Sequence, residues 1–237
     1  MEFNLLRAGD EKDREQWLVA IERLPSERQD VYFYPEYLQA YEHSADIEAY
    51  CAVYKKDNAI LLYPFLKSVI HLTENVPNTS VLQDIQTPYG YGGPVVNGAG
   101  EDPKFLHEVW SNFADWCLAE GVVSEFVRFH PLIDNVRWVP QLMNTFVDRL
   151  TIPIPLERYP EDLYGTSYYS RHRQMLNKAE RVGFTFDVLP AESELSWFFP
   201  LYQETQDYLQ AADDVRFGED YFKSLTEGFG SRAWLGV

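Results

Sequence analysis

Hydrophobic residues recur at helical spacing near the start of the chain. Asp10 is a suitable N-cap, and apolar side chains follow at helical spacing until Pro25 ends the pattern (Trp17, Leu18, Ile21 and Leu24). This pattern predicts a first helix. Pro35 then suits the first turn of a short helix, which would carry Tyr37, Leu38 and Tyr41.

The next patterned stretch predicts a hairpin followed by a long loop. Residues 48–54 and 59–67 are apolar runs typical of strands, and the polar residues 55–58 between them indicate a turn. Residues 83–100 hold five glycines and two prolines, which is too many breakers for regular structure. We therefore expect a loop over all of residues 83–100.

The clearest helical pattern begins at Asp102 and Pro103, an N-cap followed by a first-turn proline, and ends at Gly121. Residues 122–129 then read as a strand on which Phe126 and Arg128 share a face, with His130 next in the alternation. A further strand is predicted at about 145–155. Because it ends in prolines, we place a domain boundary there, between 1–152 and 153–237.

Beyond this boundary, the pattern predicts a basic helix over 168–182 closed by Gly183, a strand over 184–189, and helices over 192–211 and 218–227. The last residues, RAWLGV, read as a strand that is only beginning. A strand without a partner would mean that the chain is shorter than the functional protein. The repeated order of strand, helix and strand predicts a mixed α/β fold of two related units.

Composition and charge narrow the class of protein. Apolar residues make up 46% and charged residues 24%, as in ordinary globular proteins. The net charge of −17 opposes binding to nucleic acid. The chain shows neither a bilayer-spanning apolar run nor a signal-peptide pattern, so we expect a cytoplasmic protein. The cysteines, Cys51 and Cys117, fit buried thiols, and the five histidines lack zinc spacing, so no metal site is predicted.

The strongest candidate for a functional element is the loop TPYGYGGP, residues 87–94. Its glycines allow positive φ and close backbone approach to a ligand, and its tyrosines offer rings and hydroxyls (Tyr89, Gly90, Tyr91, Gly92 and Gly93). Sugars and phosphates both suit such a surface. The same composition is also typical of a compact structural loop, and the spacing fails the dinucleotide-binding GxGxxG pattern at Val95.

Two further groups of residues are candidates. Arg171, Arg173, Lys178 and Arg181, set against the single acid Glu180, make the predicted helix basic, and Arg171 and Lys178 share a face that could hold a phosphate or carboxylate. A solvated helix face is the alternative. Arg128 and His130 lie where a strand ends and can reach a cleft, although a lone histidine there is more often structural.

The segments TPYGYGGP, VVSEFVRFHPL and SRHRQMLNKAERVGF, in this order, resemble the FemAB-like branch of the GNAT acyltransferase superfamily. The resemblance runs from about Tyr32 to the end. It departs from that family at Asn177, where members commonly carry a basic residue before the lysine. It implies tandem GNAT-like domains, each a mixed sheet flanked by helices, with the second domain incomplete in this chain.

The resemblance also implies a function, namely transfer of an acyl or aminoacyl group to an amine on an amino sugar, nucleotide sugar or cell-envelope precursor. It places the loop, Arg128, His130, Arg171, Arg173 and Lys178 around a sugar-phosphate substrate. The position of His130 at the end of a strand makes it a weak candidate for the base, and a water relay would serve as well. The charge of −17 favours acetyl-CoA or another acyl-CoA over transfer RNA as donor. The alternatives are a non-catalytic glycan or nucleotide-sugar binding module, and an interaction protein that meets a basic partner. The oligomeric state is left open.

Overall fold

The computed structural model describes residues 1–43, 46–71, 81–141, 143–153 and 169–237. Its first part is built on a six-stranded mixed sheet, which confirms the predicted α/β class. The strands run in the order β1 (Glu2–Arg7), β2 (Ile47–Lys56), β3 (Ala59–Val69), β4 (Gln83–Gln86) and β6 (Val122–Phe126), and β5 (Val95–Val96) pairs with β3. Only β4 and β6 are parallel; the other pairs are antiparallel.

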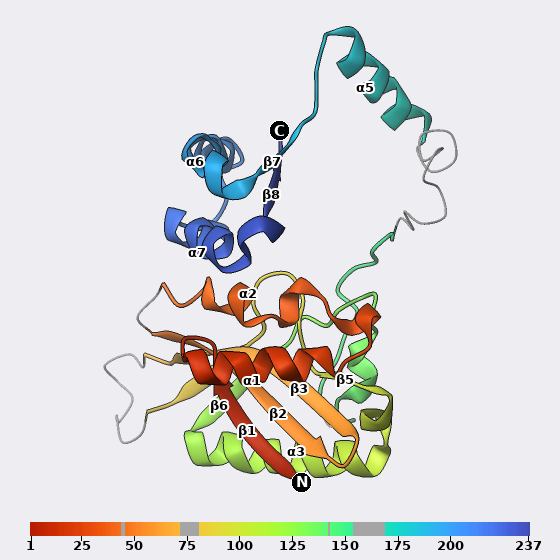
Figure 1. The fold of residues 1–237 in the computed structure, drawn as a ribbon, viewed down its shortest axis with the longest axis vertical. Coiled ribbons are helices and arrows are strands. Elements are labelled where there is room, and N and C mark those ends of the chain that lie inside the picture. The colour runs from red at the N-terminus through yellow and green to blue at the C-terminus, as the bar shows by residue number, and fades with distance from the viewer. Residues whose placement is uncertain (44–45, 72–80, 142, 154–168) are drawn as a thin grey trace.

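Helices cover both faces of this sheet. Figure 1 shows α1 (Glu11–Glu22) crossing one face, with α2 (Pro35–Gln39) nearby, and α3 (Pro103–Glu120) on the other face. Trp17 of α1 is fully buried, and its indole N–H donates to the Phe33 carbonyl at 2.9 Å. The hairpin of β2 and β3 supplies most of the remaining core, including Tyr54, Tyr63 and Phe65. The predicted helix boundaries in this part are confirmed at Asp10, Pro35, Asp102 and Gly121.

The second part consists of helices around a small sheet (Figure 1). It holds α5 (Ser170–Arg181), α6 (Ala191–Tyr208) and α7 (Glu219–Phe229), and the strands β7 (Val188–Pro190) and β8 (Trp234–Gly236). Short 3-10 turns complete the described chain at Ser26–Arg28, Val31–Phe33, Gly98–Glu101, Asn135–Trp138, Asp213–Val215 and Gly230–Arg232. The resemblance predicts a second mixed GNAT-like sheet, whereas residues 169–237 contain this two-stranded sheet.

Several predicted elements are corrected by the structure. Strand β1 was not predicted at all, and the expected loop over 83–100 contains β4 and β5. Residues 145–153 form no strand, and the predicted strand over 122–129 ends at Phe126. Only Val188 and Leu189 of the predicted strand over 184–189 are in β7. The final strand β8 does have a partner, since it pairs with β7 in antiparallel fashion.

Two further predictions concern the burial of the cysteines and the domain boundary. Cys51 is fully buried, as expected, but Cys117 is only half-buried. The proposed boundary between 152 and 153 remains a prediction, because residues 154–168 lie outside the described residues. Among the helices that the structure describes, none combines the length and hydrophobicity needed to cross a bilayer.

Candidate functional site: the glycine and tyrosine loop

The loop Thr87–Pro94 lies at the carboxyl edge of the parallel strand pair. It follows β4 directly, while residues 127–130 follow β6, and parallel strands end at the same edge of a sheet. The Thr87 amide donates to the Phe126 carbonyl at 3.0 Å, and the Arg128 amide donates to the Thr87 hydroxyl at 3.0 Å. The Gly92 amide then donates to the Arg128 carbonyl at 2.8 Å. In open α/β sheets this edge is where ligands bind.

Asn135 holds the same loop in place through hydrogen bonds. Its side chain is fully buried and donates to the carbonyls of Gly92 at 2.7 Å and Pro94 at 3.0 Å. The carboxamide oxygen accepts from the His130 amide at 2.8 Å. A single side chain therefore joins the loop after β4 to the segment after β6 and satisfies three buried backbone groups.

Two loop glycines are required by the backbone. Gly90 has φ +103° and Gly93 has φ +90°, a region that other residues rarely adopt. A Cβ atom at Gly90 would also lie 2.5 Å from the ring of Tyr32, and one at Gly93 would lie 3.0 Å from Nδ2 of Asn135. The loop is thus a tightly packed unit with a defined shape, which favours a preformed surface over a loose turn.

Tyrosines surround this loop and fix its backbone. The Tyr37 hydroxyl donates to the Tyr89 carbonyl at 2.7 Å, and the Tyr41 hydroxyl reaches the same carbonyl at 3.4 Å. The ring of Tyr91 packs edge-on against Tyr32, whereas Tyr89 as a residue is 51% exposed. Burial raises the pKa of both the Tyr37 and Tyr41 hydroxyls, so these groups stay protonated and act as donors.

Arg128 places a cation at the site. Its guanidinium carbon lies 4.9 Å from the ring centre of Phe126 and 5.7 Å from that of Tyr89. Arg128 is exposed, and within the described ranges no carboxylate lies within salt-bridge distance of it. An exposed guanidinium next to aromatic rings is suited to bind a phosphate or carboxylate.

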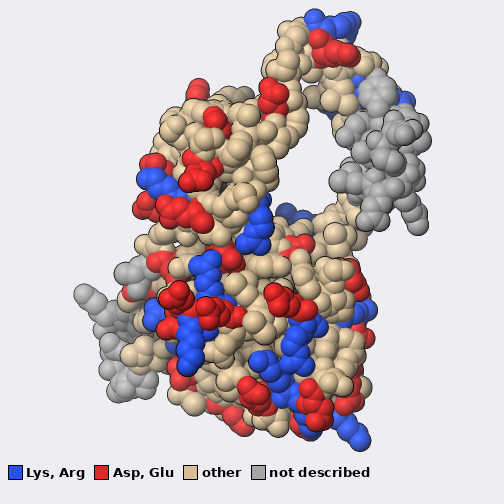
Figure 2. Space-filling view, viewed as in Figure 1, with Lys and Arg blue, Asp and Glu red and all other residues tan. Residues whose placement is uncertain are grey.

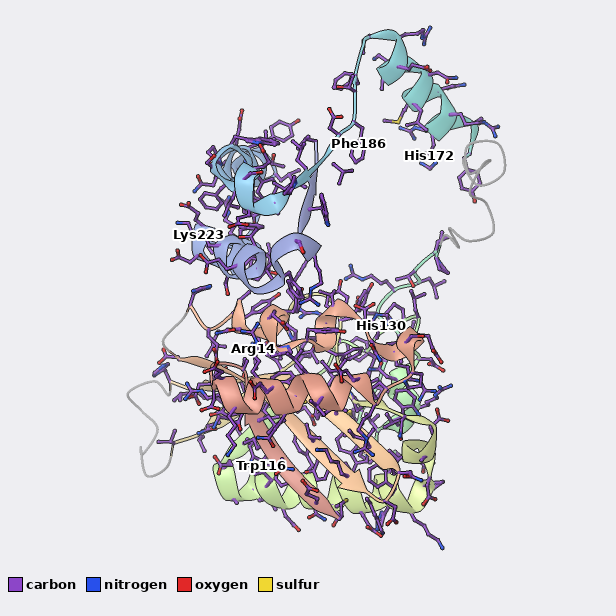
Figure 3. The ribbon with its side chains drawn as sticks, in the orientation of Figure 1. Arg14, Trp116, His130, His172, Phe186 and Lys223 are labelled. Atoms are coloured by element: carbon purple, nitrogen blue, oxygen red, sulfur yellow. The ribbon has the colours of Figure 1, made fainter. Side chains whose placement is uncertain are left out.

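His130 is buried next to this surface, and Figure 3 places it at the end of the sheet nearest α2. Its Nδ1 accepts the amides of Leu132 and Ile133, each at 3.3 Å. Its Nε2 lies 3.4 Å from the Asp30 carboxylate, and this hydrogen bond lowers the pKa of Asp30. Both ring nitrogens are thus engaged, so the geometry fits a residue that positions its neighbours better than it fits a general base.

The basic helix stands apart from the loop. Figure 1 shows α5 away from the sheet, and Figure 2 shows basic and acidic side chains side by side on it. Arg171 and Lys178 are exposed and Arg173 is half-buried. Figure 3 likewise places His172 of α5 far from His130. The structure therefore brings together Tyr89, Gly90, Tyr91, Gly92, Gly93 and Arg128, but does not bring Arg171, Arg173 and Lys178 to them.

Some residues of this region were not identified from the sequence. Asn135 and Asp30 belong to it, and so do Phe217 and Tyr221 from the segment around α7. Tyr37 and Tyr41 were assigned only to a helix. The one signal for them was the density of tyrosines in residues 32–41, which does not by itself indicate where the rings point. No group of His, Cys, Asp and Glu among the described residues could hold a metal ion.

Comparisons with known proteins add little to this picture. No protein family matches the chain, and no curated protein matches it. Among solved structures, it is similar to a ribosomal-protein-alanine N-acetyltransferase from Brucella melitensis biovar Abortus 2308, with a TM-score of 0.34 and 13% sequence identity. That similarity covers 63% of this chain and 100% of the other.

Proposed function

We propose that this protein is an N-acyltransferase whose acceptor is a small amine that carries an anionic group, such as an amino sugar phosphate or nucleotide sugar. The observation that carries the proposal is Arg128, exposed and unpaired within the described residues, held over Tyr89 at the carboxyl edge of β4 and β6. In a chain with a net charge of −17, a positive group placed at this edge would serve to bind an anion.

The acceptor would use two features of the surface. Its phosphate or carboxylate would receive charge-assisted hydrogen bonds from the Arg128 guanidinium. Its ring would lie against the exposed residue Tyr89, as sugars and bases do on aromatic side chains. The tight packing of Gly90 and Gly93 would keep this surface in one shape before the ligand arrives.

Acyl transfer itself is proposed from the resemblance of the three sequence segments to FemAB-like enzymes. The acceptor nitrogen would form a bond to the acyl carbon of a thioester such as acetyl-CoA, and the carbon–sulfur bond would break. The ammonium must first lose a proton, and the departing thiolate takes one up. We assign this proton transfer to no side chain, because His130 is engaged on both nitrogens and the pKa of Tyr37 and of Tyr41 is raised.

The test is acyl-CoA consumption with glucosamine and glucosamine 6-phosphate as acceptors, which differ only by the phosphate. We expect turnover with the phosphate ester, and a loss of about 10- to 100-fold in kcat/KM for Arg128→Ala, because a charge-assisted hydrogen bond is removed. The matched control is Arg7→Ala, since Arg7 is exposed, pairs with Glu48, and lies in β1 at the opposite edge of the sheet from β6. Equal activity of Arg128→Ala and the native protein on the phosphate ester would exclude the proposed site.

The alternative is a non-catalytic binding module for the same ligands. The specific observation that favours it is the absence, among the described side chains around the loop, of a group poised as a base. Saturable binding of glucosamine 6-phosphate that depends on Arg128, without acyl-CoA consumption, would establish this alternative.

A further inference from the structure

Phe217 lies next to the ring of Tyr89 in the loop, although Phe217 belongs to the second part of the chain. It lies between the 3-10 turn Asp213–Val215 and helix α7. Its ring is 5.7 Å from that of Tyr89, at an interplanar angle of 68°, and 6.0 Å from that of Tyr41. The two parts of the chain therefore meet at the proposed acceptor surface.

The position of Phe217 is fixed from several sides. Its backbone amide donates to the Tyr202 hydroxyl of α6 at 2.9 Å, and its ring stacks on Tyr221 of α7 with centres 4.2 Å apart. The Tyr221 hydroxyl in turn lies 3.4 Å from that of Tyr41. A ring held by both neighbouring helices can act as a rigid wall, since little conformational freedom remains to be lost on binding.

Tyr89 thus has both a cation and an aromatic ring as neighbours. The guanidinium of Arg128 and the ring of Phe217 each lie 5.7 Å from the centre of the Tyr89 ring, and Tyr89 as a residue remains 51% exposed. A ligand whose anionic group is held by Arg128 and whose ring covers Tyr89 would extend toward Phe217. A ligand without a ring would gain nothing from that contact.

We propose that Phe217 is a specificity-determining residue of the acceptor site, the wall that selects anionic ligands bearing a ring, so that the site is built from both parts of the chain. This inference rests on the proposed function, because it requires that Arg128 and Tyr89 bind the acceptor. It adds a residue, and a selection for ligand shape, that Arg128 alone would not provide.

The test compares two probes in direct binding measurements by calorimetry. Glucosamine 6-phosphate carries a ring and a phosphate, whereas phosphoethanolamine carries an amine and a phosphate without a ring. We expect Phe217→Ala to weaken binding of glucosamine 6-phosphate about 5- to 10-fold, the size of an aromatic contact, and to leave binding of phosphoethanolamine unchanged. Arg128→Ala should weaken binding of both probes.

The matched control is Phe222→Ala. Phe222 of α7 packs on Phe198 and Tyr202 of α6 and on Tyr221, so its truncation loosens the contact between α6 and α7, but its ring does not contact that of Tyr89. If Phe222→Ala weakens glucosamine 6-phosphate binding as much as Phe217→Ala, the effect is one of helix packing and the inference is wrong. It is also wrong if Phe217→Ala has no effect while Arg128→Ala weakens binding, a result that leaves the proposed function intact. If neither variant alters binding, or if the native protein binds neither probe, the proposed function fails and the inference with it.

Discussion

At the scale of single residues, Asn135 is the side chain on which the loop depends most. Asn135→Ala would leave the carbonyls of Gly92 and Pro94 and the amide of His130 without partners in a fully buried site. We expect a loss of about 3 kcal/mol in the free energy of unfolding, measured by chemical denaturation. Asn112→Ala is the control, because Asn112 is exposed and bonds only within its own helix. Equal stability of the two variants would contradict the role given to Asn135.

A second residue makes stability depend on pH. Glu125 is exposed as a residue, but one of its carboxylate oxygens accepts the hydroxyl of fully buried Tyr63 at 2.5 Å. Burial of this end raises the pKa of Glu125 above its usual value of 4.5. A carboxyl whose pKa is higher in the folded protein supports folding at low pH, and that support is lost as the pH rises through the folded pKa.

Glu125→Gln removes this loss while keeping an oxygen to accept from Tyr63. We expect the variant to be more stable than the native protein at pH 7 and the difference to disappear as the pH falls toward 4. Thermal unfolding at a series of pH values from 4 to 8 measures this. A constant difference across the series would show that Glu125 has an ordinary pKa in the folded protein.

At the scale of elements, the backbone of the loop determines which substitutions it tolerates. Gly90→Ala would place a Cβ at φ +103° and 2.5 Å from the ring of Tyr32. We expect a loss of about 2 kcal/mol in stability, because left-handed backbone and a displaced ring both cost free energy. Gly98→Ala is the matched control, since its Cβ would meet no atom within 4 Å. Urea denaturation of both variants checks this, and a stable Gly90→Ala protein would mean that the loop has room for a side chain.

The elements that could be predicted from the sequence are those fixed by local signals. Asp10, Asp102 with Pro103, and Gly121 determine helix ends through contacts within a few residues, and all of them act as expected. The hairpin of β2 and β3 is local for the same reason. The position of β4 depends on its pairing with β3 and with β6, the latter about 40 residues away. The glycine-rich composition of residues 83–100 does not indicate this pairing.

The residues of the candidate site likewise divide into those that the local sequence indicates and those that only tertiary contacts reveal. The composition of the loop indicated its glycines and tyrosines as candidates, and the position of Arg128 at the end of a predicted strand indicated Arg128. Asn135, Phe217 and Tyr221 reach the loop only through tertiary contacts, and nothing in their local sequence distinguishes them from ordinary packing residues. Residues 145–153 show the converse, because their apolar pattern predicts a strand but they have no strand partner in the structure.

At the scale of the whole molecule, one buried carboxylate joins the two parts. Glu36 of α2 is 4% exposed and lies 3.2 Å from Arg14 of α1 and 3.4 Å from Arg232, which follows α7. Gly228 of α7 packs close to the same residue, since a Cβ there would lie 3.1 Å from the Cβ of Glu36. The ion pair between Glu36 and Arg232 and the close approach of Gly228 lie at the same contact between α2 and α7.

Glu36→Ala would leave two guanidinium groups without their common partner. We expect a loss of about 1 kcal/mol in stability, because both guanidinium groups left behind are partly exposed to solvent, together with faster proteolysis of residues 169–237. Limited digestion followed by mass spectrometry measures the second effect. Asp148→Ala, which removes an exposed ion pair, should leave both the unfolding midpoint and the cleavage pattern unchanged. A digestion pattern unaltered by Glu36→Ala would show that α7 is held by its other contacts alone.

The buried tyrosine hydroxyls at the contact of α7 with α2 and with Tyr41, which follows α2, have a spectroscopic consequence. Burial raises the pKa of Tyr37, Tyr41 and Tyr221, and Tyr221 further raises the pKa of Tyr37 and of Tyr41. In an alkaline titration followed by tyrosinate absorbance, these rings would therefore ionise later than the exposed tyrosines. If α7 separates from α2, their burial ends and they ionise with the rest, so the shape of the absorbance curve would report whether the two parts are in contact.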